Sequence, residues 1–235
     1  MHVSIHQPDF IPWLGFFDKI RLSDLFIIGD NVQFRKKGWT NRNQIKTANG
    51  ASWLTIPVYQ ELGQSINVVK IRKESQNNME WYETHLRTLQ VNYGKSKFFD
   101  EYISHVEKIY RKKHEFLVDF NLELLELTLK LLDIKVPILK LSEMNLGGEK
   151  TELIVNICKK VGADSYLSGK GGANYIDENL MKSNNIKLVY HKFNHPEYEQ
   201  RFMKLGFIPN MSIIDLLFNE GSNSLNIIKT GSPNS

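Results

Sequence analysis

Two histidines, His6 and His195, are the residues of this sequence best suited to acid–base chemistry. A neutral imidazole can take up a proton near physiological pH or hydrogen-bond a phosphate. Gln7 and Pro8 follow His6, and proline keeps the residue before it extended, so the side chains of His6 and Gln7 are expected to project from a strand end. We therefore predict that His6 and His195 are catalytic. The alternative for His6 is an imidazole satisfied by a nearby carbonyl.

A second group of candidates lies in GWTNRNQIKT, residues 38–47. Arginine is the natural bidentate partner of a phosphate, so we predict that Arg42 and Lys46 hold a diphosphate. Alternation along a strand puts Asn41 and Asn43 on one face and Arg42 on the other, so one ligand meets all of them only if the strand bulges. The alternative is a solvated strand edge.

The glycine-rich stretch LSGKGGANYID, residues 167–177, has the parts of a phosphate or sugar site. Glycines let the backbone approach a phosphate, and a following helix presents free N–H groups. Its spacing differs from GxGxxG and from the Walker A pattern, and a simple tight turn is the alternative. The full predicted substrate-binding set comprises Gln7, Trp13, Asp30, Gln33, Asn41, Arg42, Lys46, Ser168, Gly169, Lys170, Gly171, Tyr175, Asp177, Tyr198 and Gln200.

The elements that position these residues follow an alternating pattern. A strand at 3–5, a helix over about 13–22 and an apolar strand within 24–30 indicate a βαβ unit. The same alternation returns later in the chain, as a helix at 150–161 ending at Gly162, a strand at 164–169, a glycine-rich turn and helix in 170–183 and a strand in 186–193. The pattern predicts an α/β fold with a Rossmann-like, mostly parallel sheet, whose strands gather ligand-binding residues at their carboxyl ends.

The middle of the chain has a different character. An Asn-Gly turn at residues 49–50 separates two probable strands, and two long amphipathic helices follow. We predict one α/β domain over 1–235 with a mainly helical insertion or subdomain at about 78–135. The polar end of the chain, SNSLNIIKTGSPNS, is expected to fray at its last residues.

Composition limits the class of protein. The chain has 235 residues with 41% hydrophobic content, and its longest apolar runs fall short of the roughly 20 residues of a membrane span. The beginning lacks the succession of a signal peptide, so we expect a cytoplasmic protein. Its single cysteine, Cys158, excludes an intramolecular disulfide, and helical spacing predicts a buried structural thiol.

Charge and metal-ligand patterns are weak. The formal charge of +4 comes from scattered Lys and Arg, which disfavours nucleic acid and suits a mildly basic cleft for small anions. His191 and His195 lack an adjacent cysteine or paired carboxylate, so no metal site is predicted, and His191 fits a core position. Any Mg²⁺ would be held mainly by the phosphates of a nucleotide or nucleotide-sugar substrate.

Several ordered motifs resemble those of the WbqC-like proteins of bacteria. They run through nearly the whole chain: IHQPDFIPWLGFFDKIRLSDLFIIGDNVQF, KKGWTNRNQIK, WLTIPV, YLSGKGGANYID, FNHPEYEQ and NMSIIDLLFNEG. Genes of this family lie typically in clusters for O-antigen, capsule and other surface polysaccharides. The resemblance implies work on activated sugars or their substituents, beside aminotransferases and acyltransferases.

The opening layout is also distantly similar to that of nucleotidyltransferases with the motif G-x-F-D-P-x-H-x-G-H. Gly15 matches the last glycine, but Trp13 and Phe16 stand where the two histidines would be. Helical spacing predicts that Phe16 is core, whereas Trp13 is either core or a ligand platform. The resemblance implies a related fold without the same phosphate contacts, unless His6 or His195 supplies an imidazole from another direction.

These observations lead to three functional hypotheses. The first is a transferase that acts on a nucleotide-activated amino sugar in O-antigen or other surface-glycan biosynthesis, by acyl, amino or nucleotidyl transfer. The second is a non-catalytic ligand-binding component of a glycan-assembly complex. The third is a protein that modifies or binds nucleic acid. Assembly into a homo-oligomer is compatible with each hypothesis.

Overall fold

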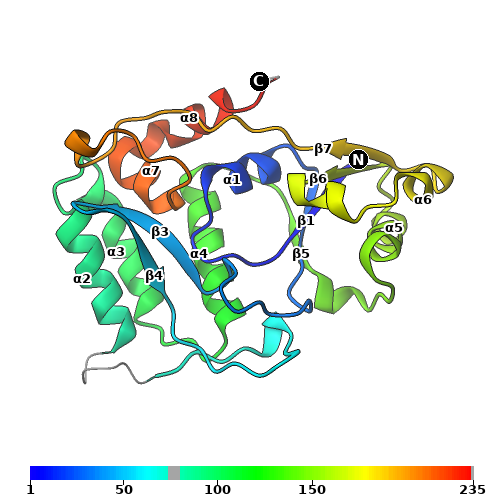
Figure 1. The fold of residues 1–235 in the computed structure, drawn as a ribbon, viewed down its shortest axis with the longest axis horizontal. Coiled ribbons are helices and arrows are strands. Elements are labelled where there is room, and N and C mark those ends of the chain that lie inside the picture. Colours follow the sequence, from blue (N-terminus) through cyan, green and yellow to red (C-terminus); the bar gives the residue numbers. More distant parts are fainter. Residues whose placement is uncertain (74–79, 234–235) are drawn as a thin grey trace.

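A five-stranded parallel sheet organises the protein, for which a computed structural model describes residues 1–73 and 80–233 (Figure 1). Its strands run in the order β5-β2-β1-β6-β7, and every pairing is parallel. Their bounds are β1 His2–His6, β2 Leu25–Ile28, β5 Ile138–Lys140, β6 Ser165–Ser168 and β7 Lys187–Tyr190. The predicted Rossmann-like α/β class is confirmed.

Three helices make the crossovers of this sheet. Helix α1 (Leu14–Arg21) joins β1 to β2, α5 (Lys150–Val161) leads from β5 to β6, and α6 (Glu178–Ser183) joins β6 to β7. Because β2 lies inside the sheet, it is apolar on both faces. Phe26 and Ile28 join the core that contains α1, while Ile27 joins a second core with α5 and α6. The sheet therefore separates two hydrophobic cores.

The other end of the molecule contains a hairpin and most of the remaining helices (Figure 1). The hairpin pairs β3 (Arg42–Thr47) with β4 (Gly50–Thr55) in antiparallel register. The helices are α2 Trp81–Tyr93, α3 Phe99–Tyr110, α4 Leu117–Leu131, α7 Ile213–Glu220 and α8 Ser224–Thr230. The prediction of two long helices in the middle is wrong, because breaks after Tyr93 and Tyr110 divide this stretch into three.

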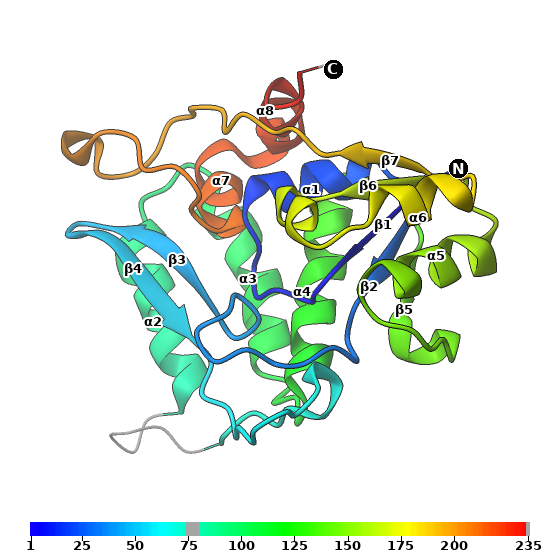
Figure 2. The same ribbon diagram turned by 45° about the vertical axis from the view of Figure 1, so that its right-hand side comes forward.

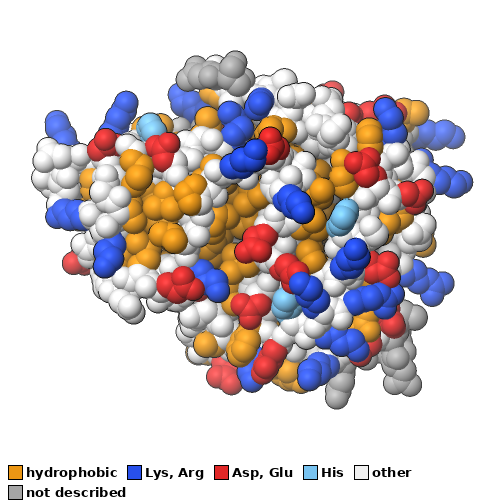
Figure 3. Space-filling model, turned by 180° about the vertical axis from the view of Figure 1, so that it is seen from behind, with side chains coloured by type: hydrophobic (Ala, Val, Ile, Leu, Met, Phe, Trp, Pro, Cys, Tyr) orange, Lys and Arg blue, Asp and Glu red, His pale blue; other side chains and the backbone are white. Residues whose placement is uncertain are grey.

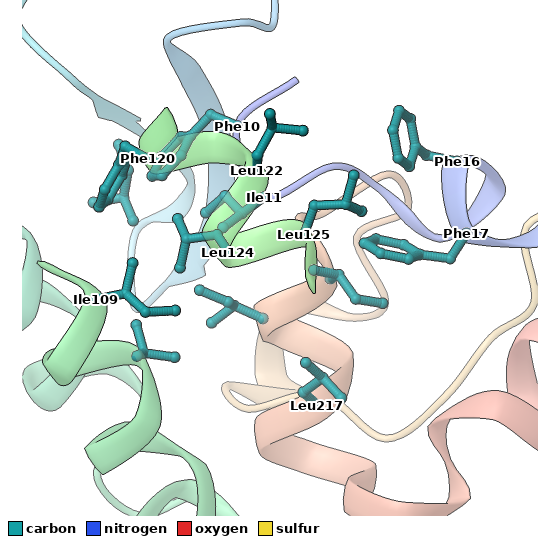
Figure 4. Close-up of a cluster of buried hydrophobic side chains, with 14 of the residues drawn as sticks. Phe10, Ile11, Phe16, Phe17, Ile109, Phe120, Leu122, Leu124, Leu125 and Leu217 are labelled. Carbon is teal, nitrogen blue, oxygen red and sulfur yellow. The ribbon is translucent and has the colours of Figure 1, made fainter. Parts of the chain in front are cut away.

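The larger core connects the two ends of the molecule. Figure 4 shows Phe10 and Ile11, from the loop after β1, beside Phe120, Leu122 and Leu124 of α4. Figure 2 shows the same loop running from the sheet toward the hairpin. Apolar packing against the helical end thus holds the first loop of the chain in place. Such packing contributes about 25 cal/mol for each Å² of apolar surface buried.

Some local predictions are confirmed and others are not. Helix α5 ends at Gly162, whose φ of 70° supplies the left-handed cap. The glycine-rich turn and helix predicted over 170–183 are confirmed, because a 3₁₀ turn at Lys170–Asn174 precedes α6. The polar end includes α8, while residues 234–235, expected to fray, lie outside the described residues. Short 3₁₀ helices occur at Ile66–Val68, Leu141–Met144, Lys170–Asn174, Met203–Leu205 and Gly221–Asn223.

Two global properties follow from the described part of the chain. Within it, no helix is both long and apolar enough to cross a membrane. Figure 3 shows the side opposite to that of Figure 1, where basic and acidic side chains are interspersed around apolar ones. On that face no region of a single charge sign dominates, which agrees with the scattered charges of the sequence.

Candidate functional site

The carboxyl end of β1 lies at the point where the chain reverses the order in which it adds strands to the sheet. From β1 the chain moves to β2 on one side, and β6 later joins on the other side. The strands β1 and β6 pair over their first two residues, His2 with Ser165 and Val3 with Tyr166, whereas β1 and β2 pair over four. The β1 and β6 chains therefore separate toward their carboxyl ends, which is where open α/β sheets bind ligands.

His6 ends β1 and is held in one tautomer. Its Nδ1 atom lies 3.1 Å from the Gln7 carbonyl oxygen. Because a carbonyl can only accept, Nδ1 donates and Nε2 carries the lone pair of the neutral ring. Burial and the charge of Lys19 lower the His6 pKa to about 3. The ring also packs edge-on against Phe16, at 4.9 Å between centroids, so Nε2 is a fixed, neutral acceptor.

Asp9 and Lys19 complete a titratable group around His6, which we call the His6–Asp9–Lys19 cluster. The Asp9 carboxylate lies 3.6 Å from His6 Nδ1 and its side chain is only 10% exposed. Burial raises the Asp9 pKa to about 7, against the opposing charge of Lys19. Lys19 is 4% exposed and donates from Nζ to the Ile5 carbonyl at 2.9 Å. Burial lowers its pKa to about 7, and the charge of Asp9 opposes that shift.

Asp9 and Lys19 lie outside the predicted site, although the sequence contains one signal for Lys19. Helix α1 presents Phe16 and Ile20 to the sheet, and Lys19 falls in the same buried stretch. A lysine among apolar positions of an amphipathic helix is costly to bury unless it serves a purpose. Side chains with pKa values near neutrality are suited to proton transfer, so this cluster is a candidate for proton-transfer chemistry.

His195 occupies a different pocket, made of aromatic rings. Its Nδ1 donates to the Pro196 carbonyl at 2.9 Å, and Nε2 is buried with no partner among the described residues. The ring lies between Trp13 and Tyr198, at centroid distances of 6.2 and 6.3 Å. Burial lowers the His195 pKa. Like His6, it therefore presents a neutral Nε2 acceptor.

The two histidines meet the two aromatic residues of the opening motif. His6 contacts Phe16, which is buried as predicted, and His195 contacts Trp13. Trp13 and Phe16 lie one turn apart, because the Phe16 amide donates to the Trp13 carbonyl. The indole also covers Gly15, where a Cβ atom would come within 2.3 Å of the ring. Each of these two aromatic rings thus packs against an imidazole that comes from outside α1.

Several predicted binding residues instead hold the protein together. Asp30 accepts from the Ser142 amide and hydroxyl, at 2.9 and 2.6 Å. Asn41 donates to Ile56, and Asp177 caps α6 through the Asn179 and Leu180 amides. Tyr198 and Gln200 both donate to Asp215. These polar groups are engaged within the fold, and their predicted role in substrate binding stays a prediction.

Arg42 and Lys46, predicted to share a diphosphate, lie in different surroundings. The Arg42 guanidinium stacks 4.2 Å from the Trp53 ring centroid and donates to the carbonyls of Lys37 and Gly38. Lys46 is buried and donates from Nζ to the Gly206 carbonyl at 2.6 Å. Burial lowers the Lys46 pKa, against the charge of Asp215. Lys46 is therefore covered by the 206 segment, and only Arg42 lies beside an exposed ring.

The glycine-rich turn is the most open part of the predicted set. Lys170, Gly171 and Tyr175 are exposed, as is Gln33 on another loop, while Gln7 and Gly169 are half-buried. Ser168 is buried and donates to the Gly169 carbonyl. A Cβ atom at Gly172 would lie 1.9 Å from Ser168 Oγ, so this glycine permits the close turn. An exposed turn of this kind leaves room for a sugar or phosphate.

Asp18 and His191 are joined by a buried hydrogen bond. Fully buried Asp18 receives hydrogen bonds from His191, Ser232 and Arg21. Burial favours the neutral acid, but those donors outweigh it and lower the Asp18 pKa. Buried Cys158, as expected of a structural thiol, has its pKa raised to about 11 by burial. Across residues 1–73 and 80–233, no group of three or more His, Cys, Asp or Glu side chains could hold a metal ion.

Comparisons with known proteins agree with the motifs of the sequence. The model of the WbqC-like protein family matches residues 7–227, nearly the whole chain. The uncharacterized protein Rv1507c of Mycobacterium tuberculosis is 35% identical over 222 residues, which cover 94% of each chain. No solved structure matches the chain.

Proposed function

Because the chain belongs to the WbqC-like protein family, we propose that it is a transferase acting on a nucleotide-activated amino sugar in bacterial surface-glycan biosynthesis, such as that of O-antigen. The family resemblance supports a role with activated sugars. The parallel sheet supports a ligand at the carboxyl end of β1, where a nucleotide-linked substrate would bind.

One observation carries the proposal. His6 and His195 cover Phe16 and Trp13, the positions at which nucleotidyltransferases have histidines. Both imidazoles keep a neutral Nε2 acceptor, because each Nδ1 donates to a backbone carbonyl. The two imidazoles thus offer acceptors near the first turn of α1, in place of the donors with which the motif histidines hold phosphates, and the proposed group transfer uses them as acceptors.

In this proposal, the His6–Asp9–Lys19 cluster moves the proton. The attacking amine or hydroxyl of the acceptor gives its proton to His6 Nε2 as it forms the new bond. The leaving group departs with the electron pair of the old bond and recovers the proton. Ionised Asp9, 3.6 Å from Nδ1, stabilises the imidazolium, so activity should rise with pH through the Asp9 pKa of about 7. His195 and the exposed glycine-rich turn bind the substrate.

The test combines a biochemical and a cellular measurement. Purified protein is incubated with nucleotide sugars and with acyl, amino or nucleotidyl donors, and mass spectrometry follows the nucleotide sugar. A new nucleotide-sugar product that disappears in His6→Gln is expected. In a strain that depends on the gene, His6→Gln and His195→Gln are compared with His105→Gln, an exposed histidine on α3. Unchanged surface glycan in both site variants would leave only a non-catalytic binding role.

A further inference from the structure

Two exposed tryptophans form a platform on the outer side of the β3–β4 hairpin. Trp39 is 48% exposed and Trp53 is 41% exposed, and their ring centroids lie 5.3 Å apart at an angle of 39°. Ile45 and Leu54 point to the opposite, buried face of the hairpin. Adjacent exposed indoles are rarely left without a partner, because large apolar side chains on a surface mark interaction sites.

Positive charge borders this platform. Arg42 stacks on Trp53 and is held there by the carbonyls of Lys37 and Gly38. Arg35, Lys36 and Lys37 are exposed on the loop before Trp39. Residues 31–60 contain five Lys or Arg and no Asp or Glu. The sequence segment that carries the platform therefore has a net positive charge, and no acidic residue of that segment offsets it. This combination of rings and positive charge favours a planar ligand with negative charge.

The platform is tied to the loop that carries Asp9. The Phe10 amide donates to the Trp39 carbonyl at 3.0 Å. Asn121 Nδ2 donates to the carbonyls of Pro8 and Thr40, both at 2.7 Å. These bonds place the segment around Trp39 beside the segment around Asp9. A ligand on the indoles can therefore extend toward the His6–Asp9–Lys19 cluster.

We infer that Trp39, Trp53 and Arg42 bind the nucleotide part of the substrate, with the base against the indoles and the phosphates toward the basic margin. This deepens the proposed function and rests on it for the choice of a small nucleotide. A neutral sugar would account for the rings but not for the cations. A nucleic acid strand would need a longer basic surface, whereas the platform has two rings and the basic residues named beside it lie within the short segment 35–42.

Tryptophan fluorescence tests the inference with the intact chain. The probes are UDP, the diphosphates of the other common nucleosides, inorganic pyrophosphate and a short oligouridylate. At least one nucleoside diphosphate should quench the fluorescence saturably and bind at least about tenfold more tightly than pyrophosphate, because base stacking adds about 1.4 kcal/mol or more. Competition with pyrophosphate measures how much of the nucleotide binding comes from charge alone. This measurement uses only the unaltered protein.

Variants then locate the site. The affinity for the quenching nucleotide, measured by calorimetry, should fall about tenfold in Trp39→Ala and in Trp53→Ala. Trp39→Phe should retain most of it, and Tyr59→Ala, at another ring that is 57% exposed, should bind as the unaltered protein does. Asp9→Asn should bind the nucleotide normally even if turnover is lost, which separates this inference from the proposed function.

Three results would overturn the inference. The first is nucleotide affinity no greater than pyrophosphate affinity. The second is unchanged affinity in both tryptophan-to-alanine variants, with thermal unfolding showing that they are folded. The third is tighter binding of oligouridylate than of any mononucleotide, with a steep dependence on salt, which would assign the platform to a nucleic acid.

Discussion

Two buried carboxylates, Asp9 and Asp215, differ in how they are satisfied. Burial raises the pKa of both. Asp215 receives hydrogen bonds from Tyr93 at 2.7 Å, Tyr198 at 2.7 Å and Gln200 at 2.9 Å. Within the described residues, no group donates a hydrogen bond to the Asp9 carboxylate, and His6 Nδ1 lies 3.6 Å away. Asp9 therefore keeps acceptor capacity for chemistry, whereas that of Asp215 is used in the fold.

The Asp215 network connects elements that are distant in sequence. It joins α7 to α2 through Tyr93 and to the loop after β7 through Tyr198 and Gln200. The Tyr93 hydroxyl also accepts from the Lys46 amide of β3. A satisfied buried network of this kind specifies one arrangement of the helical end. Burial and a raised pKa are common to both carboxylates, so unmet hydrogen-bonding capacity at a strand end is what makes Asp9 the stronger catalytic candidate.

The largest expected effect is on turnover in Asp9→Asn. The amide cannot ionise to stabilise the His6 imidazolium, so kcat/KM for the nucleotide sugar should fall by about 10²–10⁴-fold. Thermal unfolding should show a folded protein, because the lost carboxylate makes no hydrogen bond within the described residues. Activity within a few-fold of the unaltered protein would remove Asp9 from the proposed mechanism.

The next effect is on stability in Asp215→Ala. This change leaves the donors of Tyr93, Tyr198 and Gln200 without their acceptor, and the free energy of unfolding in urea should fall by about 3 kcal/mol. Asp119→Ala, on the exposed side of α4, is the control and should change stability little. If Asp215→Ala were stable but inactive, the assignment of the two carboxylates would be reversed.

Lys19→Met should alter the pH profile. Lys19 lies buried on α1, and its positive charge lowers the Asp9 pKa, so its loss should move that pKa upward. The acidic limb of kcat/KM, which follows ionisation of Asp9, should therefore shift to higher pH. The exposed lysine Lys135 provides the control variant Lys135→Met. A limb that stays in place would show that Asp9 does not set it.

Asp18→Asn should produce the smallest effect, which is present near neutral pH and lost in acid. Because the folded-state pKa of Asp18 is lowered, its contribution to stability is present above the ordinary value of 3.8 and is lost as pH falls through the folded value. The stability difference between Asp18→Asn and the unaltered protein, measured in urea, should shrink as the pH falls below 3.8. A difference independent of pH would mean that Asp18 contributes by packing alone.

Local signals predicted much of the fold. The helix before Gly162, the Asn-Gly hairpin and the apolar strand β2 each have a pattern that does not depend on distant partners. Strand β5 was missed because it has three residues and owes its conformation to pairing with β2. Short strands of this kind are specified by tertiary contacts rather than by propensity.

The candidate site was harder to predict than the fold. His6 and His195 could be singled out by residue type and by their strand-end positions, and their catalytic roles stay predictions. Lys46 was selected for its charge, but the segment around Gly206 covers it, and nothing near Lys46 in the sequence indicates this. Asp9 and Lys19 owe their shifted pKa values to burial, which only the folded chain provides.

Helix α1 is anchored on two sides by adjacent residues. Asp18 is bonded to His191 and Ser232, near the other end of the chain, while Lys19 is bonded to Ile5 of β1. Exchange of the α1 amide protons with solvent is expected to require release of both anchors. These protons should therefore be among the slowest to exchange in the molecule, and the proton-transfer geometry should persist through local opening of the hairpin and outer helices.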